Sequence, residues 1–136
     1  MVEMNITYEG GLHCKAVHGP SGAIIVTDAP VDNHGNGQNF SPTDLCAVSL
    51  GVCMITIMGI ACEGRNINIT GTTCRIEKHM SADTPRRIVK IIADVNFPSG
   101  IPADKRQMLK TAAENCPVSK SLHPDIDVDM RFTFPD

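Results

Sequence analysis

The chain has 136 residues, a formal net charge of −3 and six cysteines. Its length predicts a single domain spanning residues 1–136. It has no basic block and only five aromatic residues, four Phe and one Tyr, so neither nucleic acid nor a membrane surface is an expected partner. The N-terminus lacks the basic and apolar regions of a signal peptide, and we therefore expect a cytoplasmic protein.

An even number of cysteines is also typical of secreted proteins held together by disulfides. We disfavour that class because the chain is not short and carries no export signal. The sequence contains no Cys-x-x-Cys, and its five histidines are scattered. We therefore expect no metal site.

The first 40 residues predict short strands and turns. Met4, Ile6 and Tyr8 alternate with polar residues, as in a strand with one apolar face. After Gly10-Gly11, residues 12–17 predict a second strand, and residues 23–28 a third that returns as a hairpin. Residues 29–40 are rich in Pro, Gly, Asn and Asp and predict a loop.

A long helix is predicted next. Ser41 is a suitable N-cap, Pro42 is tolerated in the first turn, and Asp44 favours the positive helix end. No residue from 45 to 62 is charged, and Gly64 is a suitable C-cap. The run is just long enough for a membrane span, but small and polar residues interrupt it and no second such segment exists. A helix that is apolar on all sides is buried on all sides, so a partner subunit is expected to help cover it.

The remainder of the chain predicts more strands and a second main helix. Alternation within residues 66–80, 89–97 and 126–134 predicts strands, whereas residues 103–115 predict an amphipathic helix and 117–122 a short one. The fold class is therefore α+β, with antiparallel strands and two main helices.

Helix geometry separates the three cysteines of the long helix. Cys46 and Cys53 are seven residues apart and share a face, whereas Cys62 is nine residues beyond Cys53 and lies on roughly the opposite face. A buried cysteine is usually a small apolar residue, which is our interpretation of Cys62, and of Cys14 and Cys74. Spacing alone favours the same interpretation for Cys53.

Cys116 differs because Pro117 follows it. If Pro117 begins a short helix, Cys116 is its cap, backbone N–H groups point near the sulfur, and the thiolate is favoured. The alternative is an ordinary cysteine in a turn.

Two motifs resemble those of the OsmC/Ohr family, the osmotically inducible and organic hydroperoxide resistance proteins. Residues 41–53, Ser-Pro-Thr-Asp-Leu-x-x-x-Ser-Leu-Gly-x-Cys, are similar to the helix that carries the family's first active cysteine. Residues 116–120, Cys-Pro-Val-Ser-Lys, are similar to the motif of the second. The order of predicted elements is also similar across nearly the whole chain.

The resemblance implies a fold and an activity. The fold would be an intertwined homodimer in which antiparallel sheets surround a long buried central helix. The activity would be a thiol-dependent peroxidase that reduces organic hydroperoxides, with Cys53 as the peroxidatic thiolate and Cys116 as the resolving thiol. Cys53 would become a sulfenic acid, Cys116 would form a disulfide with it, and an external dithiol, of the lipoyl type in the Ohr branch, would reduce the pair. No metal, flavin or other cofactor is implied.

The sequence departs from the family pattern at two places. Active members use an Arg from the N-terminal region to hold the thiolate, but this chain has no Arg before Arg65. His13 or Lys15 lies near the equivalent strand and could substitute. The Glu of the Ohr type is replaced by Thr43, and the adjacent Asp44 matches the acid of a more divergent branch. Helix capping is the alternative role for Asp44.

Two other functions compete with the peroxidase. The first is a non-catalytic binding module of the same fold, in which an apolar dimer pocket holds a small hydrophobic ligand. The second is general thiol–disulfide exchange, which the absence of Cys-x-x-Cys disfavours.

Overall fold

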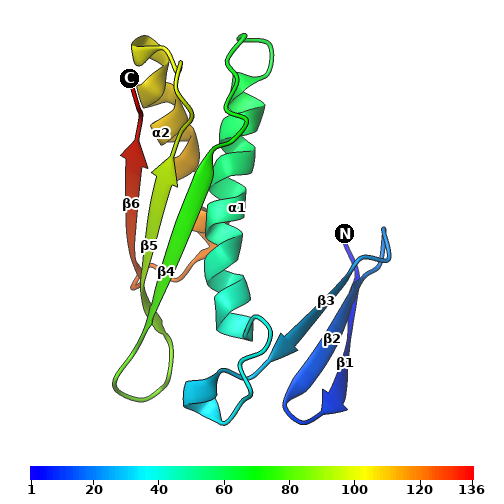
Figure 1. The fold of residues 1–136 in the computed structure, drawn as a ribbon. Helices are drawn as coiled ribbons and strands as arrows, with labels where there is room; N and C mark the ends of the chain where they lie inside the picture. Colours follow the sequence, from blue (N-terminus) through cyan, green and yellow to red (C-terminus); the bar gives the residue numbers. More distant parts are fainter. The chain divides into compact units, whose positions relative to one another are not determined.

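A computed structural model describes all 136 residues, and the chain divides into two compact units, Met1–Cys46 and Ala47–Asp136. Figure 1 labels the helices and strands of both. The expectation that residues 1–136 form a single domain stays a prediction.

The N-terminal unit is built on a three-stranded antiparallel sheet. Its strands are β1 (Met4–Gly10), β2 (His13–His18) and β3 (Ile24–Asp28), in the order β1-β2-β3. The three predicted strands are thus confirmed. The following loop contains one 3₁₀ turn, η1 (Val31–Asn33).

Helix α1 (Pro42–Cys62) begins as the sequence predicts. The Ser41 hydroxyl accepts a hydrogen bond from the Asp44 backbone N–H at 3.0 Å, and the Asp44 carboxylate accepts one from the Ser41 N–H at 2.9 Å. This reciprocal pair is a capping box, which satisfies two backbone donors at the helix start. Beyond the helix, Gly64 adopts φ +72°, as expected for a residue that ends a helix.

The C-terminal unit contains the second sheet, in the order β4-β5-β6. Its strands are β4 (Thr73–Met80), β5 (Ile88–Asn96) and β6 (Asp127–Thr133). Strands β4 and β5 are antiparallel, but β5 and β6 are parallel, so the expectation of antiparallel strands is wrong for this pair. The reason is the connection after β5, which consists of helices and returns the chain to the end of the sheet where β5 started.

That connection contains η2 (Ala103–Lys105), α2 (Arg106–Glu114) and α3 (Pro117–Ser121). The predicted helix over 103–115 therefore starts as a 3₁₀ turn. The strand expected from residue 66 begins only at Thr73, because Asn66 and Gly71 have φ values of +56° and +93°, which an extended strand does not accept.

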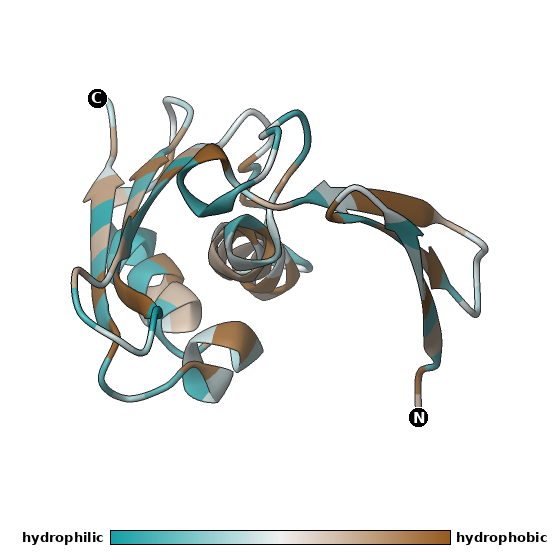
Figure 2. Cartoon of the chain, turned by 90° about the horizontal axis from the view of Figure 1, so that it is seen from below, coloured by the Kyte–Doolittle hydropathy of each residue, from teal (hydrophilic) through white to brown (hydrophobic).

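The core of the C-terminal unit lies where α1 and α2 pack on one face of this sheet (Figures 1 and 2). The buried residues that α1 contributes are spaced three or four positions apart: Ala47, Leu50, Met54, Met58 and Cys62. They pack with inward residues of β5 and with Leu109 and Ala113 of α2. This spacing places one face of α1 on the sheet.

Within one chain, α1 is less buried than its composition predicts. Only 33% of its most apolar 18-residue window is buried, and by length and composition alone the helix could cross a membrane. Val52 and Ile60 are 61% and 57% exposed. This incomplete burial agrees with the expectation that a single chain cannot cover the helix on all sides, because one three-stranded sheet covers one face of a helix. Coverage of the other faces by a partner subunit stays a prediction.

Gly51 and Gly59 of α1 provide a matched test of this packing. A Cβ at Gly51 would lie 3.0 Å from Ile76 Cδ1 and 3.2 Å from Cys74 Sγ, whereas at Gly59 it would meet nothing within 4 Å. Ala gains about 1 kcal/mol over Gly in a helix, and overpacking costs about 1–3 kcal/mol. We expect Gly59→Ala to stabilise the protein and Gly51→Ala to lose that gain or destabilise it, as measured by urea unfolding. Equal stabilisation by both substitutions would contradict the close approach of α1 to β4.

Candidate functional site

The structure brings the two predicted active cysteines together. Cys53 lies on α1 and is partly buried against the core, and Cys116 lies at the start of α3 and is fully buried. Cys53 is the one titratable side chain among the groups that shift the pKa of Cys116, so the two side chains lie close to each other, and both are free thiols. Two thiols in such proximity can exchange a proton or form a disulfide once one of them is oxidised.

Cys116 occupies the break between α2 and α3. Its backbone is extended, with φ −66° and ψ 149°, and Pro117 is the first residue of α3. The Cys116 Sγ accepts a hydrogen bond from the Ser119 backbone N–H at 3.4 Å. The interpretation of Cys116 as a helix cap is therefore confirmed, and the alternative of an ordinary turn cysteine is wrong.

The consequence that we expected from this cap, a favoured thiolate at Cys116, is wrong. Burial raises the pKa of the Cys116 thiol, because a charged sulfur loses its hydration there. The backbone N–H groups of Ser119 and Val118 lower this pKa, but the neighbouring Cys53 thiol raises it further. Cys116 is thus a protonated thiol at neutral pH.

The other cysteines have surroundings unlike those of this pair. Cys62 belongs to the buried core, and Cys74 packs against that core from β4. Burial raises the pKa of both thiols. Cys46 is exposed on the first turns of α1, and Cys14 lies on β2 in the N-terminal unit. The positions of Cys62 and Cys74 agree with the interpretation of these two cysteines as packing residues.

The remaining predicted site residues belong to the N-terminal unit, whereas both thiols belong to residues 47–136. His13 Nδ1 lies 2.8 Å from Asp28 Oδ1, and His13 Nε2 lies 3.4 Å from Glu9 Oε1. Lys15 is on β2, and Asp44 is in the capping box. The capping role of Asp44 is confirmed. A role for His13, Lys15 or Asp44 at the thiolate stays a prediction.

Sequence reasoning missed the polar cluster around Asp28. This carboxylate is 6% exposed and accepts hydrogen bonds from His13 and from Asn39 Nδ2, the latter at 2.9 Å. The bond to His13, followed by that to Asn39, lowers the pKa of Asp28. The hydrogen bond from Asn39 connects the predicted loop to Asp28 at the end of β3. The only sequence feature that indicated this cluster is the charged residue Asp28 at the end of an apolar strand.

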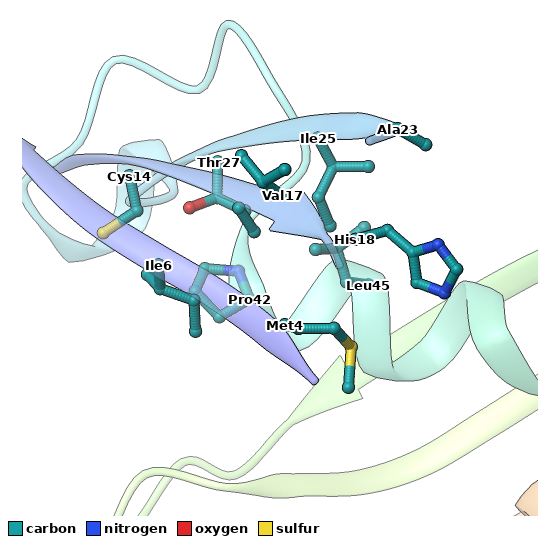
Figure 3. A pocket seen from close by; sticks show the side chains of 11 residues that line it. Met4, Ile6, Cys14, Val17, His18, Ala23, Ile25, Thr27, Pro42 and Leu45 are labelled. Atoms are coloured by element: carbon teal, nitrogen blue, oxygen red, sulfur yellow. The ribbon is translucent and has the colours of Figure 1, made fainter. Parts of the chain in front are cut away.

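The N-terminal unit also contains an apolar hollow of about 530 Å³ (Figure 3). Met4, Ile6 and Ile25 of the sheet line it together with Leu45 of α1. His18 also lines the hollow, and its Nδ1 shares a hydrogen bond with the Ser21 hydroxyl at 2.6 Å. No group of three or more His, Cys, Asp or Glu side chains suited to a metal ion occurs in the structure.

Comparisons with known proteins agree with the fold and the two motifs. The model of the OsmC-like protein family matches residues 35–131. A Psychrobacter arcticus structure, named for osmotic stress induction and a detoxification response, is 42% identical with a TM-score of 0.92, covering 98% of this chain and 96% of that one. No curated protein matches the chain.

Two organic hydroperoxide resistance proteins have the same fold at lower identity. The Legionella pneumophila protein is 15% identical with a TM-score of 0.77 over 98% of this chain and 96% of its own. OhrB of Bacillus subtilis is 20% identical with a TM-score of 0.70 over 98% of each chain.

The proximity of the two thiols can be tested by oxidation. We expect diamide to produce a Cys53–Cys116 disulfide as the main linkage, because Cys53 is the only thiol among the groups that shift the pKa of Cys116. Peptide mapping under non-reducing conditions would identify it. Cys116→Ser should abolish this linkage, whereas substitution of the exposed Cys46 by Ser should leave it unchanged. A dominant linkage through Cys62 or Cys74 would contradict the arrangement.

Proposed function

Because the chain belongs to the OsmC-like protein family, we propose that it is a thiol-dependent peroxidase that reduces organic hydroperoxides. The observation that carries this proposal is the proximity of two free thiols, Cys53 and Cys116. The names of the Legionella and Bacillus relatives, which refer to organic hydroperoxide resistance, support the substrate class.

The two cysteines have different proposed roles because their surroundings differ. Cys53 is only partly buried, so a hydroperoxide can reach it, and it is the proposed peroxidatic residue. Cys116 is buried and protonated, which suits a resolving thiol that acts after the first oxidation. The sulfenic acid at Cys53 and the thiol of Cys116 would form a disulfide and release water. An external dithiol, which is of the lipoyl type in the Ohr branch, would then reduce it without any metal or flavin.

The thiolate at Cys53 needs stabilisation, and no Arg precedes Arg65. His13 and Lys15 of the N-terminal unit are the proposed substitutes, with Asp44 as a possible orienting acid. His13 already lies between two carboxylates, Glu9 and Asp28, so its charge is partly engaged when it is protonated. Lys15 is a compact cation without the fixed fork of a guanidinium.

We also propose that two copies of the chain form a homodimer. The sheet of the N-terminal unit exposes Met4, Ile6 and Tyr8, and α1 exposes Val52 and Ile60. Figure 2 shows the hydrophobic residues on these elements. Monomeric proteins rarely leave apolar surface of this extent in water. A second copy is the proposed cover because it supplies apolar surfaces of the same kind.

A second candidate function is a non-catalytic binding module. The apolar hollow beside Leu45 favours it, because a hollow of about 530 Å³ can hold a small hydrophobic ligand. The missing N-terminal Arg favours it as well. In this case Cys53 and Cys116 would not catalyse the reduction of a hydroperoxide.

The peroxidase proposal predicts activity that depends on Cys53. The reduced protein should consume cumene hydroperoxide with dihydrolipoamide, and Cys53→Ser should lower the rate to the uncatalysed background. Substitution of Cys116 by Ser should block disulfide formation and leave a sulfenic acid at Cys53, because the resolving thiol is gone. Mass spectrometry after trapping with a sulfenic acid probe would detect it.

The matched control for this experiment is Cys46→Ser, which changes an exposed thiol of the same helix. Its rate should equal that of the wild type. If the folded wild type consumes no hydroperoxide and native mass spectrometry detects a retained apolar ligand, the binding module is the correct function.

The dimer proposal predicts a mass of twice the 14.6 kDa of one chain in light scattering. Ile6→Lys and Ile60→Lys remove apolar side chains that are 72% and 57% exposed in the single chain. Each should raise the dimer dissociation constant about 10- to 100-fold, because burial of one such side chain contributes about 1.5–3 kcal/mol. Thr73→Lys, on an exposed polar position of β4, is the control. A monomeric wild type would disprove the dimer.

A further inference from the structure

The two cysteines of the candidate site differ in how closely a molecule from solution can approach them. Cys53 lies at the edge of the packed face of α1 and is partly buried, and Val52 beside it is 61% exposed. Cys116 is 0% exposed. A disulfide between these two cysteines therefore has one sulfur near the surface and one in the core.

The segment that follows Cys116 holds this residue in the core. Val118 of α3 and the following Leu122 both pack against the buried cluster to which Cys116 belongs. The Lys120 backbone N–H donates to the Cys116 carbonyl oxygen at 3.2 Å, and the Leu122 N–H donates to that of Val118 at 3.1 Å. Exposure of the Cys116 sulfur therefore requires this segment, or its packed neighbours, to separate from the core.

Thiol–disulfide exchange also has a preferred direction of approach. The attacking thiolate approaches along the line of the S–S bond, from the side opposite the sulfur that leaves. For attack on Cys53, that side points away from Cys116 and thus away from the core. For attack on Cys116, the approach runs through the core itself. Because exchange depends on access to the sulfur that is attacked, Cys53 is the favoured target.

We propose that the external reductant attacks Cys53, so that the intermediate of the reductive step is a mixed disulfide on Cys53 with Cys116 as the leaving group. The inference rests on the proposed peroxidase function and names the sulfur at which its second half proceeds. Cys53 meets both the oxidant and the reductant at one position of the surface. Cys116 forms a covalent bond only with Cys53.

The atoms and electrons balance over two exchanges. One thiolate of the dithiol attacks the Cys53 sulfur, a new S–S bond forms, and the bond from Cys53 to Cys116 breaks. Its electron pair stays on Cys116, which takes up a proton, and the second thiol of the reductant gives one up. The thiolate so formed attacks the reductant sulfur bound to Cys53, closes a cyclic disulfide and releases the Cys53 thiolate. The protein gains two electrons and the dithiol loses two.

The acidity of the leaving group acts against this direction. Burial raises the pKa of Cys116, and a sulfur with a higher pKa leaves more slowly. The backbone N–H of Ser119, which donates to Cys116 Sγ at 3.4 Å, offsets part of this cost. Access has the larger effect, because a slow departure still gives product, whereas a covered sulfur cannot be attacked until the core opens locally.

The test locates the mixed disulfide directly. The Cys46→Ser variant, which lacks the exposed free thiol of α1, would be oxidised with diamide, mixed briefly with glutathione and quenched with acid. After the free thiols are blocked, trypsin digestion without reduction separates the two sulfurs. Cys116 is the only cysteine of the tryptic peptide 111–120, and fragmentation of the peptide 16–65 identifies an adduct on Cys53.

We expect the glutathione adduct on Cys53 to exceed that on Cys116 about tenfold or more in the folded protein. This factor corresponds to a local opening of about 1.4 kcal/mol before Cys116 can be attacked. In protein unfolded by urea both sulfurs are exposed, so the two adducts should be comparable. An equal or larger adduct on Cys116 in the folded protein overturns the inference. A preference for Cys53 that is unchanged by unfolding also overturns it, because the fold would then not be its cause.

This result is independent of the peroxidase assay. Diamide forms the disulfide without a peroxide, so the sulfur that is attacked can be identified even if the protein consumes no hydroperoxide. In that case the proposed function fails and the preference for Cys53 still holds. If diamide forms no bond between Cys53 and Cys116 in the folded protein, the reductant has no such bond to attack and the inference is wrong.

Discussion

The close packing of α1 on the second sheet determines where the candidate site lies. Gly51 has no side chain, and the positions around its missing Cβ are occupied by Ile76 and Cys74 of β4. Leu50 and Met54 on either side are fully buried. Cys53 directly precedes Met54, at the edge of this buried face, so the helix leaves its sulfur half-covered. A thiol at the centre of the face would be out of reach of a substrate, and one on the opposite side would be far from Cys116.

The same core positions Cys116. Leu109 and Ala113 anchor α2 in the hydrophobic layer, and Pro117 cannot continue a helix with a normal backbone hydrogen bond. The chain therefore breaks at residue 116, directly beyond the buried part of α2, and Cys116 remains inside the core. The thiol pair is thus a product of the packing of α1 and α2 on one sheet.

The sequence predicted the features that depend on neighbours along the chain. Ser41 and Asp44 indicated the capping box, Pro117 indicated a cap at Cys116, and the alternation of apolar residues indicated the strands. It did not predict the parallel pairing of β5 with β6, since side-chain alternation is the same in both orientations. It also gave the wrong charge preference for Cys116. Helix capping is local, but burial depends on residues far away in the sequence, and here burial has the larger effect on the pKa. The contact of Cys53 with Cys116 came only from the family resemblance.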